Sequence, residues 1–286
     1  MLTRWPEPLP TWRKLALATW RPSDDPQIYG WLDLDATALL ALVARLREET
    51  GVHVTLTHVV GAAVARAFRD CPDANAVASR RGLLKRSSVD LFFSVKTKGK
   101  GLTGTKLEGL DDASPITIAQ RLNEGVTTIH ASGDTPLLRS QRQLGALPSF
   151  LLRPAMYAAT AVSLDLGLDL SRFGVPHDPF GTAVVTNIGT LGLERGLAPL
   201  IPTGRTAALF TVGKIHEGVV AVAGRPTVRP VLTLGATFDH RIVDGNQLGR
   251  LQATLRRCLE SPAEHLLPEK ERPAPEAQGS TTIALP

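Results

Sequence analysis

A histidine and an aspartate lie four residues apart near the C-terminal end of the chain, within residues 238–245 (FDHRIVDG). An imidazole with an ordinary pKa near ~6.5 can take a proton from one thiol and return it to another. Histidine followed at this spacing by Asp-Gly is typical of sites that transfer acyl groups between thiols. Taken alone, the pattern fits equally well a common turn and helix cap that carry a solvated histidine.

The flanking residues predict which elements hold this motif. Residues 231–238 (VLTLGATF) form a mostly apolar run that predicts a strand, so His240 follows a strand end. Asp244 is expected to accept backbone N–H groups at the start of a helix, and Gly245 to allow a sharp turn that a residue with a Cβ would strain. The helix itself is predicted from leucines at helical spacing, namely Leu248, Leu251, Leu255 and Leu259.

Several ordered blocks of sequence precede the motif and give it a family context. Residues 181–189 (GTAVVTNIG), 205–215 (RTAALFTVGKI) and 228–230 (VRP) come in order before the strand that ends at His240. With this spacing, the chain resembles the catalytic domain of the acyltransferase component of 2-oxo acid dehydrogenase complexes, whose wider relatives include chloramphenicol acetyltransferase. The resemblance is strongest over residues 181–262.

The resemblance continues more weakly upstream. Residues 12–18 are similar to the family's opening helix, and residues 32–40 to its first core strand running into a helix. Residues 57–76 are similar to its long helix and the turn that follows.

The resemblance implies a mechanism for coenzyme A thioesters. His240 would be the general base that deprotonates the thiol of coenzyme A or of a dihydrolipoyl group. Thr186 matches the family's serine, whose hydroxyl stabilises the oxyanion, and Asn187 matches a neighbour that supports the same loop. A threonine hydroxyl can still donate, although β-branching restricts its χ1. The alternative is that Thr186 is an ordinary β-branched strand residue with no catalytic role.

The family also implies a structural role for Asp244 and an assembly. The equivalent carboxylate is mainly structural and pairs with an arginine near the N-terminus, for which Arg13 is the best match. Arg13 as a surface charge in a basic N-terminal region is the alternative. In the relatives the pocket lies between subunits of a trimer, so we expect a homotrimer or a multiple of trimers.

The expected fold is α/β, a chloramphenicol acetyltransferase-like two-layer mixed sheet flanked by helices, over residues 1–267. A mobile tail is predicted over 268–286, which is rich in Pro, Glu and Ala. Residues 124–178 depart most from the family and predict an added helical hairpin that packs on the domain or on another subunit. Pro148 and Pro154 argue against a membrane span there, which leaves membrane-surface contact as a minor alternative.

Charge does not favour nucleic acid as a partner. The net charge is +5, but the cluster Lys96, Lys98, Lys100 and Lys106 lies among glycines without interleaved aromatic residues. A solvated loop is one interpretation of this cluster. Contact with the phosphates of coenzyme A is the other.

The remaining features of the sequence concern the cysteines, the cellular compartment and the partners. Cys71 and Cys258 make no metal motif and are expected to be buried free thiols. The N-terminus has no apolar run of the signal-peptide type, which predicts a cytoplasmic protein. The resemblance begins by about residue 12, so we expect any lipoyl group to come from a separate protein, with dehydrogenase components as further possible partners. Two alternatives stay open: an acyltransferase acting on a small hydroxyl or amine, and a non-catalytic trimeric scaffold of the same fold.

Overall fold

A computed structural model describes residues 26–80, 82–95, 103–132, 148–168, 170 and 177–272. The helices are α2 (Thr37–Thr50), α3 (Leu56–Asp70), α4 (Pro115–Ser132), α6 (Ser149–Thr160, continued by a π turn over Ala161–Asp165), α7 (Gly245–Glu260) and α8 (Pro262–Leu266). The strands are β1 (Gln27–Asp35), β2 (Ala76–Ser79), β3 (Gly82–Lys85), β4 (Leu91–Val95), β5 (Thr103–Leu107), β6 (Ala183–Asn187), β7 (Ala208–Val212), β8 (His216–Val222) and β9 (Arg225–Asp239).

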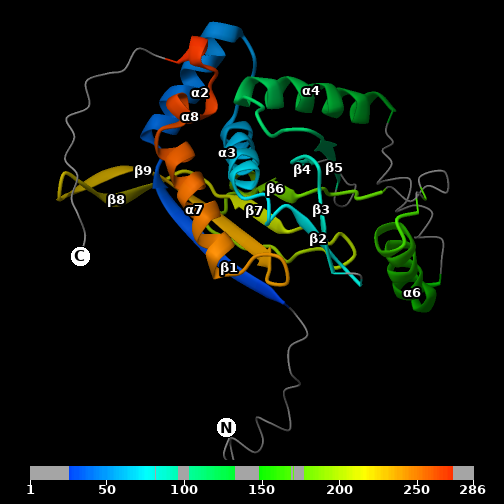
Figure 1. The fold of residues 1–286 in the computed structure, drawn as a ribbon. Coiled ribbons are helices and arrows are strands. Elements are labelled where there is room, and N and C mark those ends of the chain that lie inside the picture. The colour runs from blue at the N-terminus through cyan, green and yellow to red at the C-terminus, as the bar shows by residue number, and fades with distance from the viewer. Residues whose placement is uncertain are drawn as a thin grey trace, which may run out of the picture.

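A mixed seven-stranded sheet forms the centre of the molecule (Figure 1). Its order is β1-β9-β7-β6-β4-β5, with β8 paired to the first half of β9, and β2 and β3 make a separate hairpin. Strands β4, β6 and β7 are parallel to one another, whereas β9 runs antiparallel to both β7 and β1. The C-terminal end of the long β9 therefore lies beside the first residues of β1 and β7, at the end of the sheet where β6 also begins.

All the helices except α6 lie on one face of this sheet (Figure 1). Alternate residues of the strands, such as Ala183 and Val185 in β6 and Phe210 in β7, belong to the large apolar core beneath α2, α3 and α7. Because side chains alternate along a strand, the residues between them face away from the helices. Phe92, Val184 and Leu209 do so, and they form a second apolar cluster with Phe180 and Leu200.

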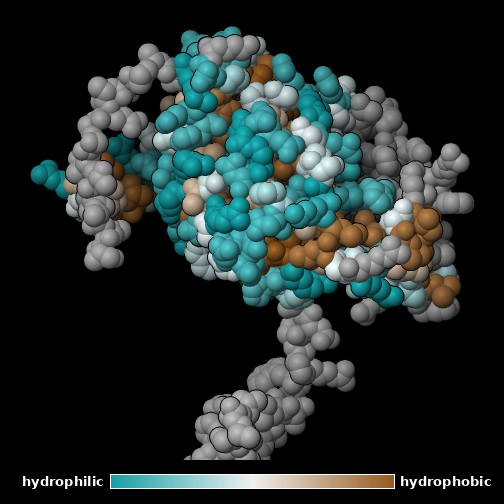
Figure 2. Space-filling view, viewed as in Figure 1, coloured by the Kyte–Doolittle hydropathy of each residue, from teal (hydrophilic) through white to brown (hydrophobic). Residues whose placement is uncertain are grey.

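The second face is covered by the chain between β6 and β7 and is bordered by α6. Thr160 of α6 donates through its hydroxyl to the carbonyl of Thr203 at 3.4 Å, and Asp165 pairs with Arg205. Figure 2 shows apolar side chains gathered at α6 and along the adjoining strip of surface, whereas the helical face is mostly hydrophilic. Tyr157 and Leu151 of α6 are exposed.

The predicted elements around the motif are confirmed. The apolar run 231–238 lies in β9, and Leu251, Leu255 and Leu259 form the buried face of α7. The strand and helix expected from residues 32–40 are β1 and α2, and the long helix is α3. Residues 12–18 lie outside the described part of the chain.

The two cysteines are buried and free, as expected. The segment 124–178 contains the end of α4 and all of α6, with residues 133–147 outside the description. No helix in the described ranges is long and apolar enough to cross a membrane.

Candidate active site

His240 stands immediately after β9, in a tight turn. Its backbone N–H donates to the carbonyl of Pro26 at 2.7 Å, which ties the turn to the start of β1. Its ring Nδ1 lies 2.9 Å from the carbonyl oxygen of Val243. A carbonyl can only accept, so in the neutral imidazole the proton sits on Nδ1 and the lone pair on Nε2. The loop thus fixes the tautomer in which Nε2 is the basic nitrogen, on a residue that is exposed.

The two neighbours of His240 form an ion pair that the sequence did not lead us to expect. Nε of Arg241 donates to Oδ1 of Asp239 at 2.9 Å, and Nη2 donates to Oδ2 at 2.6 Å. The Asp239 carboxylate, whose side chain is only 4% exposed, also accepts the backbone N–H of Arg241 at 3.0 Å. These bonds hold the pKa of Arg241 above its usual range. The ion pair and the backbone bond thus hold the two ends of the His240 turn to each other.

Asp244 caps α7, as the sequence predicted. Its Oδ1 accepts the backbone N–H of Asn246 at 2.7 Å and that of Gln247 at 3.4 Å, and the Gln247 side chain accepts the N–H of Asp244 in return. The residue itself is exposed. Arg13, its expected partner, lies outside the described residues.

The role expected for Gly245 is wrong. It is the first residue of α7, its φ is not positive, and a Cβ built on it would meet no atom within 4 Å. The turn is made instead by the backbone N–H groups of Ile242 and Val243, which both donate to the carbonyl of Asp239 at 2.9 Å. A side chain at position 245 would therefore not strain the loop.

Thr186 lies near the C-terminal end of β6 and faces away from the helices. Its neighbours Val185 and Asn187 point the other way, toward the core and α3. The Asn187 side chain donates to the hydroxyl of Thr57 at 2.9 Å and accepts the backbone N–H of Thr190 at 3.2 Å. Asn187 thus fastens the chain after Thr186 to the first turn of α3.

The structure does not bring Thr186 and His240 together. In the register of the sheet, Thr186 of β6 pairs with Thr211 of β7, and Thr211 pairs with Gly235 of β9. Gly235 precedes His240 by five residues. At about 3.3 Å per residue and about 4.8 Å per strand, the two residues are roughly 19 Å apart. No side chain spans that distance, so within one chain the two residues cannot act on the same carbonyl.

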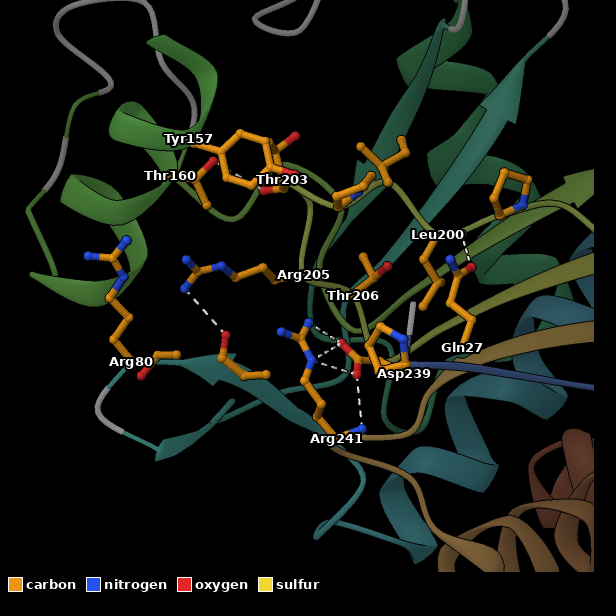
Figure 3. A pocket seen from close by; sticks show the side chains of 16 residues that line it. Gln27, Arg80, Tyr157, Thr160, Leu200, Thr203, Arg205, Thr206, Asp239 and Arg241 are labelled. Carbon is orange, nitrogen blue, oxygen red and sulfur yellow. Dashed lines mark hydrogen bonds and ion pairs between the residues drawn. The ribbon is translucent and has the colours of Figure 1, made fainter. Parts of the chain in front are cut away.

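A cavity of about 900 Å³ adjoins the His240 turn on the face away from the helices (Figure 3). Asp239 and Arg241 line it on one side, and Tyr157 and Thr160 of α6 border it on another. Nearby, both Nη atoms of Arg205 donate to the buried carboxylate of Asp165, which holds the pKa of Asp165 at about 2. This ion pair fixes the end of α6 against the chain that precedes β7.

The lysine cluster is only partly described. Lys96, Lys98 and Lys100 lie outside the described residues. Nζ of Lys106 is 2.8 Å from the Glu108 carboxylate and donates to the carbonyl of Asp178 at 3.2 Å. Its charge is therefore already partnered within the chain, which does not favour a role in binding phosphate.

Several known proteins are similar to this chain in sequence. The family model described as 2-oxoacid dehydrogenases acyltransferase (catalytic domain) matches residues 8–135 and 179–267 and leaves out 136–178. The chain is 26% identical over 246 residues to the dihydrolipoyllysine-residue acetyltransferase component of the pyruvate dehydrogenase complex of Rhizobium meliloti, and it covers 45% of that protein. It is 23% identical over 239 residues to a probable succinyltransferase component from Schizosaccharomyces pombe, and it covers 44% of that protein. These alignments include 83% and 82% of the chain.

Solved structures share the fold. A probable dihydrolipoamide acetyltransferase from Listeria monocytogenes superposes with a TM-score of 0.61 at 18% identity, covering 89% of this chain and 93% of that one. The dihydrolipoamide acetyltransferase of Azotobacter vinelandii gives a TM-score of 0.62 at 17% identity, with 85% of each chain covered. The expected mixed α/β fold is thus confirmed.

The chain spans less than half the length of the two relatives named above. The family match nevertheless covers most of its residues and includes both Thr186 and His240. The chain therefore belongs to the 2-oxoacid dehydrogenase acyltransferase family, through the catalytic domain of that family.

Proposed function

We propose that this chain transfers an acyl group between coenzyme A and a thiol acceptor of the dihydrolipoyl type, with His240 as the general base. The observation that carries the proposal is the bond from His240 Nδ1 to the Val243 carbonyl, which leaves Nε2 as the basic nitrogen of an exposed imidazole. Membership of the acyltransferase family and the names of the relatives support the choice of reaction.

The proposed reaction is a balanced exchange between two thiols. Nε2 of His240 takes the proton of the attacking thiol, and the thiolate adds to the thioester carbonyl. The resulting oxyanion accepts a hydrogen bond from the hydroxyl of Thr186. When the tetrahedral intermediate collapses, the bond to the first sulfur breaks, and His240 returns the proton to the departing thiolate.

The separation of Thr186 from His240 supports an active site made by two chains. We propose that a homotrimer, or a multiple of trimers, brings Thr186 of one subunit to His240 of its neighbour. In this arrangement Asn187 keeps the Thr186 loop in place through Thr57, and the Asp244 cap and the Asp239–Arg241 pair hold the His240 turn. Arg13 is proposed as a further support for Asp244.

The lipoyl group is proposed to come from a separate lipoyl-carrying segment or protein, with dehydrogenase components as partners. The direct test is transfer from a panel of acyl-CoA donors to dihydrolipoamide, followed as released coenzyme A. Wild type should transfer, and His240→Ala should lower the rate by about a hundredfold or more. Equal rates for the two proteins would refute the proposal. If no wild-type transfer occurs with thiol, hydroxyl or amine acceptors while the protein assembles normally, a scaffold role becomes the better explanation.

A further inference from the structure

The cavity beside His240 has a wall that the family model does not include. Tyr157 and Thr160 belong to residues 136–178, which the match leaves out, whereas Gln27, Asp239 and Arg241 belong to the matched core. The end of the wall is fixed by the ion pair between Asp165 and Arg205, which connects the inserted segment to the core. The insertion thus adds a wall to a half-open cavity at one end of the sheet face.

Three arginines from separate segments lie around this cavity (Figure 3). Both Nη groups of Arg205 donate to the Asp165 carboxylate, and Nη1 also donates to the carbonyl of Ala78. Arg241 uses Nε and Nη2 on Asp239, and its Nη1 makes no hydrogen bond within the described part of the chain. The Arg80 side chain is 83% exposed and lies 3.8 Å from Asp165. Arg80 and Arg241 therefore still have donors to offer a ligand.

The charge in the cavity suits one negative charge. Of the three arginines that line it, Arg205 pairs with Asp165, which is outside the lining, and Arg241 pairs with Asp239, so one positive charge is left over. A guanidinium fork matches the two oxygens of a carboxylate. The several phosphate charges of coenzyme A would exceed what this site neutralises.

The rest of the cavity suits a hydrocarbon body. Its apolar side is formed by Ala78 and by the run Pro199, Leu200, Ile201 and Pro202. A volume of about 900 Å³ lies at the upper end of the range for sites that hold drug-sized ligands, about 300 to 1,000 Å³. An acetyl or succinyl group would leave most of it empty.

We infer that this cavity binds a bulky acyl group whose far end carries a carboxylate, with Arg80 and Arg241 as its cationic partners. The placement follows from the chain itself, because Asp239 and Arg241 line the cavity and flank His240. Delivery of that acyl group to a thiol rests on the proposed function, whereas binding of the carboxylate does not.

Calorimetric titration with free acids tests the binding without any acyl transfer. Suberate, a long dicarboxylate, should bind more tightly than succinate, whose chain is short, and more tightly than octanol, which has no carboxylate. Arg80→Gln should weaken suberate binding about tenfold, and Arg80→Glu should weaken it further. Arg256→Gln is the matched control, because Arg256 is about half exposed and, among the described residues, forms an ion pair only with Glu260 on α7. It should leave suberate binding unchanged.

A second measurement concerns the reaction. Suberyl-CoA should be a better donor than octanoyl-CoA, and Arg80→Gln should reduce that preference about tenfold through KM. Failure of suberate to bind, equal binding of succinate, or equal loss in Arg256→Gln would each overturn the inference. If coenzyme A or inorganic phosphate bound to the same arginines more tightly than suberate, the group that the cavity recognises would be a phosphate and not a carboxylate. Suberate binding without transfer would uphold the cavity and refute the proposed reaction.

Discussion

Thr186 and His240 lie near opposite ends of one sheet, about five residues apart in register and two strands apart in order. The separation follows from the antiparallel pairing of β9 with β7, which carries His240 away from the end of β6. Since a general base and an oxyanion donor must contact the same thioester, the two residues serve one site only when supplied by different chains.

This relationship predicts complementation between two inactive variants. His240→Ala and Thr186→Ala should each lose about a hundredfold or more of the activity when assembled alone. When the two chains are refolded together in equal amounts, random assembly gives an intact site at about a quarter of the interfaces. Released coenzyme A measures the recovered activity. Absence of recovery, with mixed trimers demonstrated by mass spectrometry, would contradict a shared site.

The hydroxyl of Thr186 can be tested by three substitutions. Removing one oxyanion donor costs about 10²–10³ in kcat, so Thr186→Ala and the isosteric Thr186→Val should both show that loss. Thr186→Ser should retain most of the activity because it keeps the donor. Steady-state kinetics with KM and kcat separated measures this. If Thr186→Val were as active as wild type, Thr186 would be an ordinary strand residue.

Asp244 is expected to act on stability through the cap of α7. Asp244→Ala should lower the free energy of unfolding by about 1 kcal/mol, and Asp244→Asn should be nearly neutral, because asparagine also caps helices. Urea unfolding of the two variants measures the difference. A loss of about 3–5 kcal/mol in both would instead identify a buried ion pair, such as the one proposed with Arg13.

The Asp165–Arg205 pair is expected to be costly to break. Both side chains are largely buried, at 6% and 15% exposed, so Arg205→Met leaves the buried Asp165 carboxylate with the exposed Arg80, 3.8 Å away, as its remaining cation and should destabilise the fold by about 3 kcal/mol. The double variant Arg205→Met with Asp165→Leu should recover part of that loss. Arg195→Met is the control, since its pair with Asp33 is exposed and worth little. Equal losses in the two arginine variants would contradict this account.

His58 makes the stability depend on pH. The residue is 5% exposed, and burial lowers its pKa to about 4, aided by the nearby His53 and Arg47 charges. Between about pH 6.5 and 4 the unfolded chain therefore binds more protons than the folded one. Stability should fall by up to about 3 kcal/mol as the pH drops through that window.

The variant His58→Gln tests this dependence, because glutamine also suits the third position of a capping box. Urea unfolding at several pH values gives the free energy of unfolding as a function of pH. Below pH 6.5 this free energy should fall less steeply with decreasing pH in the variant than in wild type, and above pH 7 the two proteins should show the same pH dependence. If the variant lost stability as steeply as wild type at low pH, the acid sensitivity would belong to other groups.

Local sequence was enough to predict the elements that hold the motif. The apolar run 231–238, the leucine spacing after Gly245 and the Asp-Gly cap predicted β9, α7 and the Asp244 cap, because each depends on residues a few positions apart. The ordered blocks also predicted the family. Gly245 was misjudged because whether a glycine is needed depends on φ and on neighbouring atoms, which the sequence does not report.

Long-range pairing decided the rest. The Pro26 bond that anchors the His240 turn spans more than two hundred residues, and the register that separates Thr186 from His240 depends on how β9 aligns with β7. The Arg205–Asp165 pair and the cavity unite segments that no local pattern connects. Sequence periodicity reports which face of an element is buried, but not which distant element covers it. The chain alone therefore determined the chemistry that His240 can perform, and only the tertiary structure decided which groups can reach it.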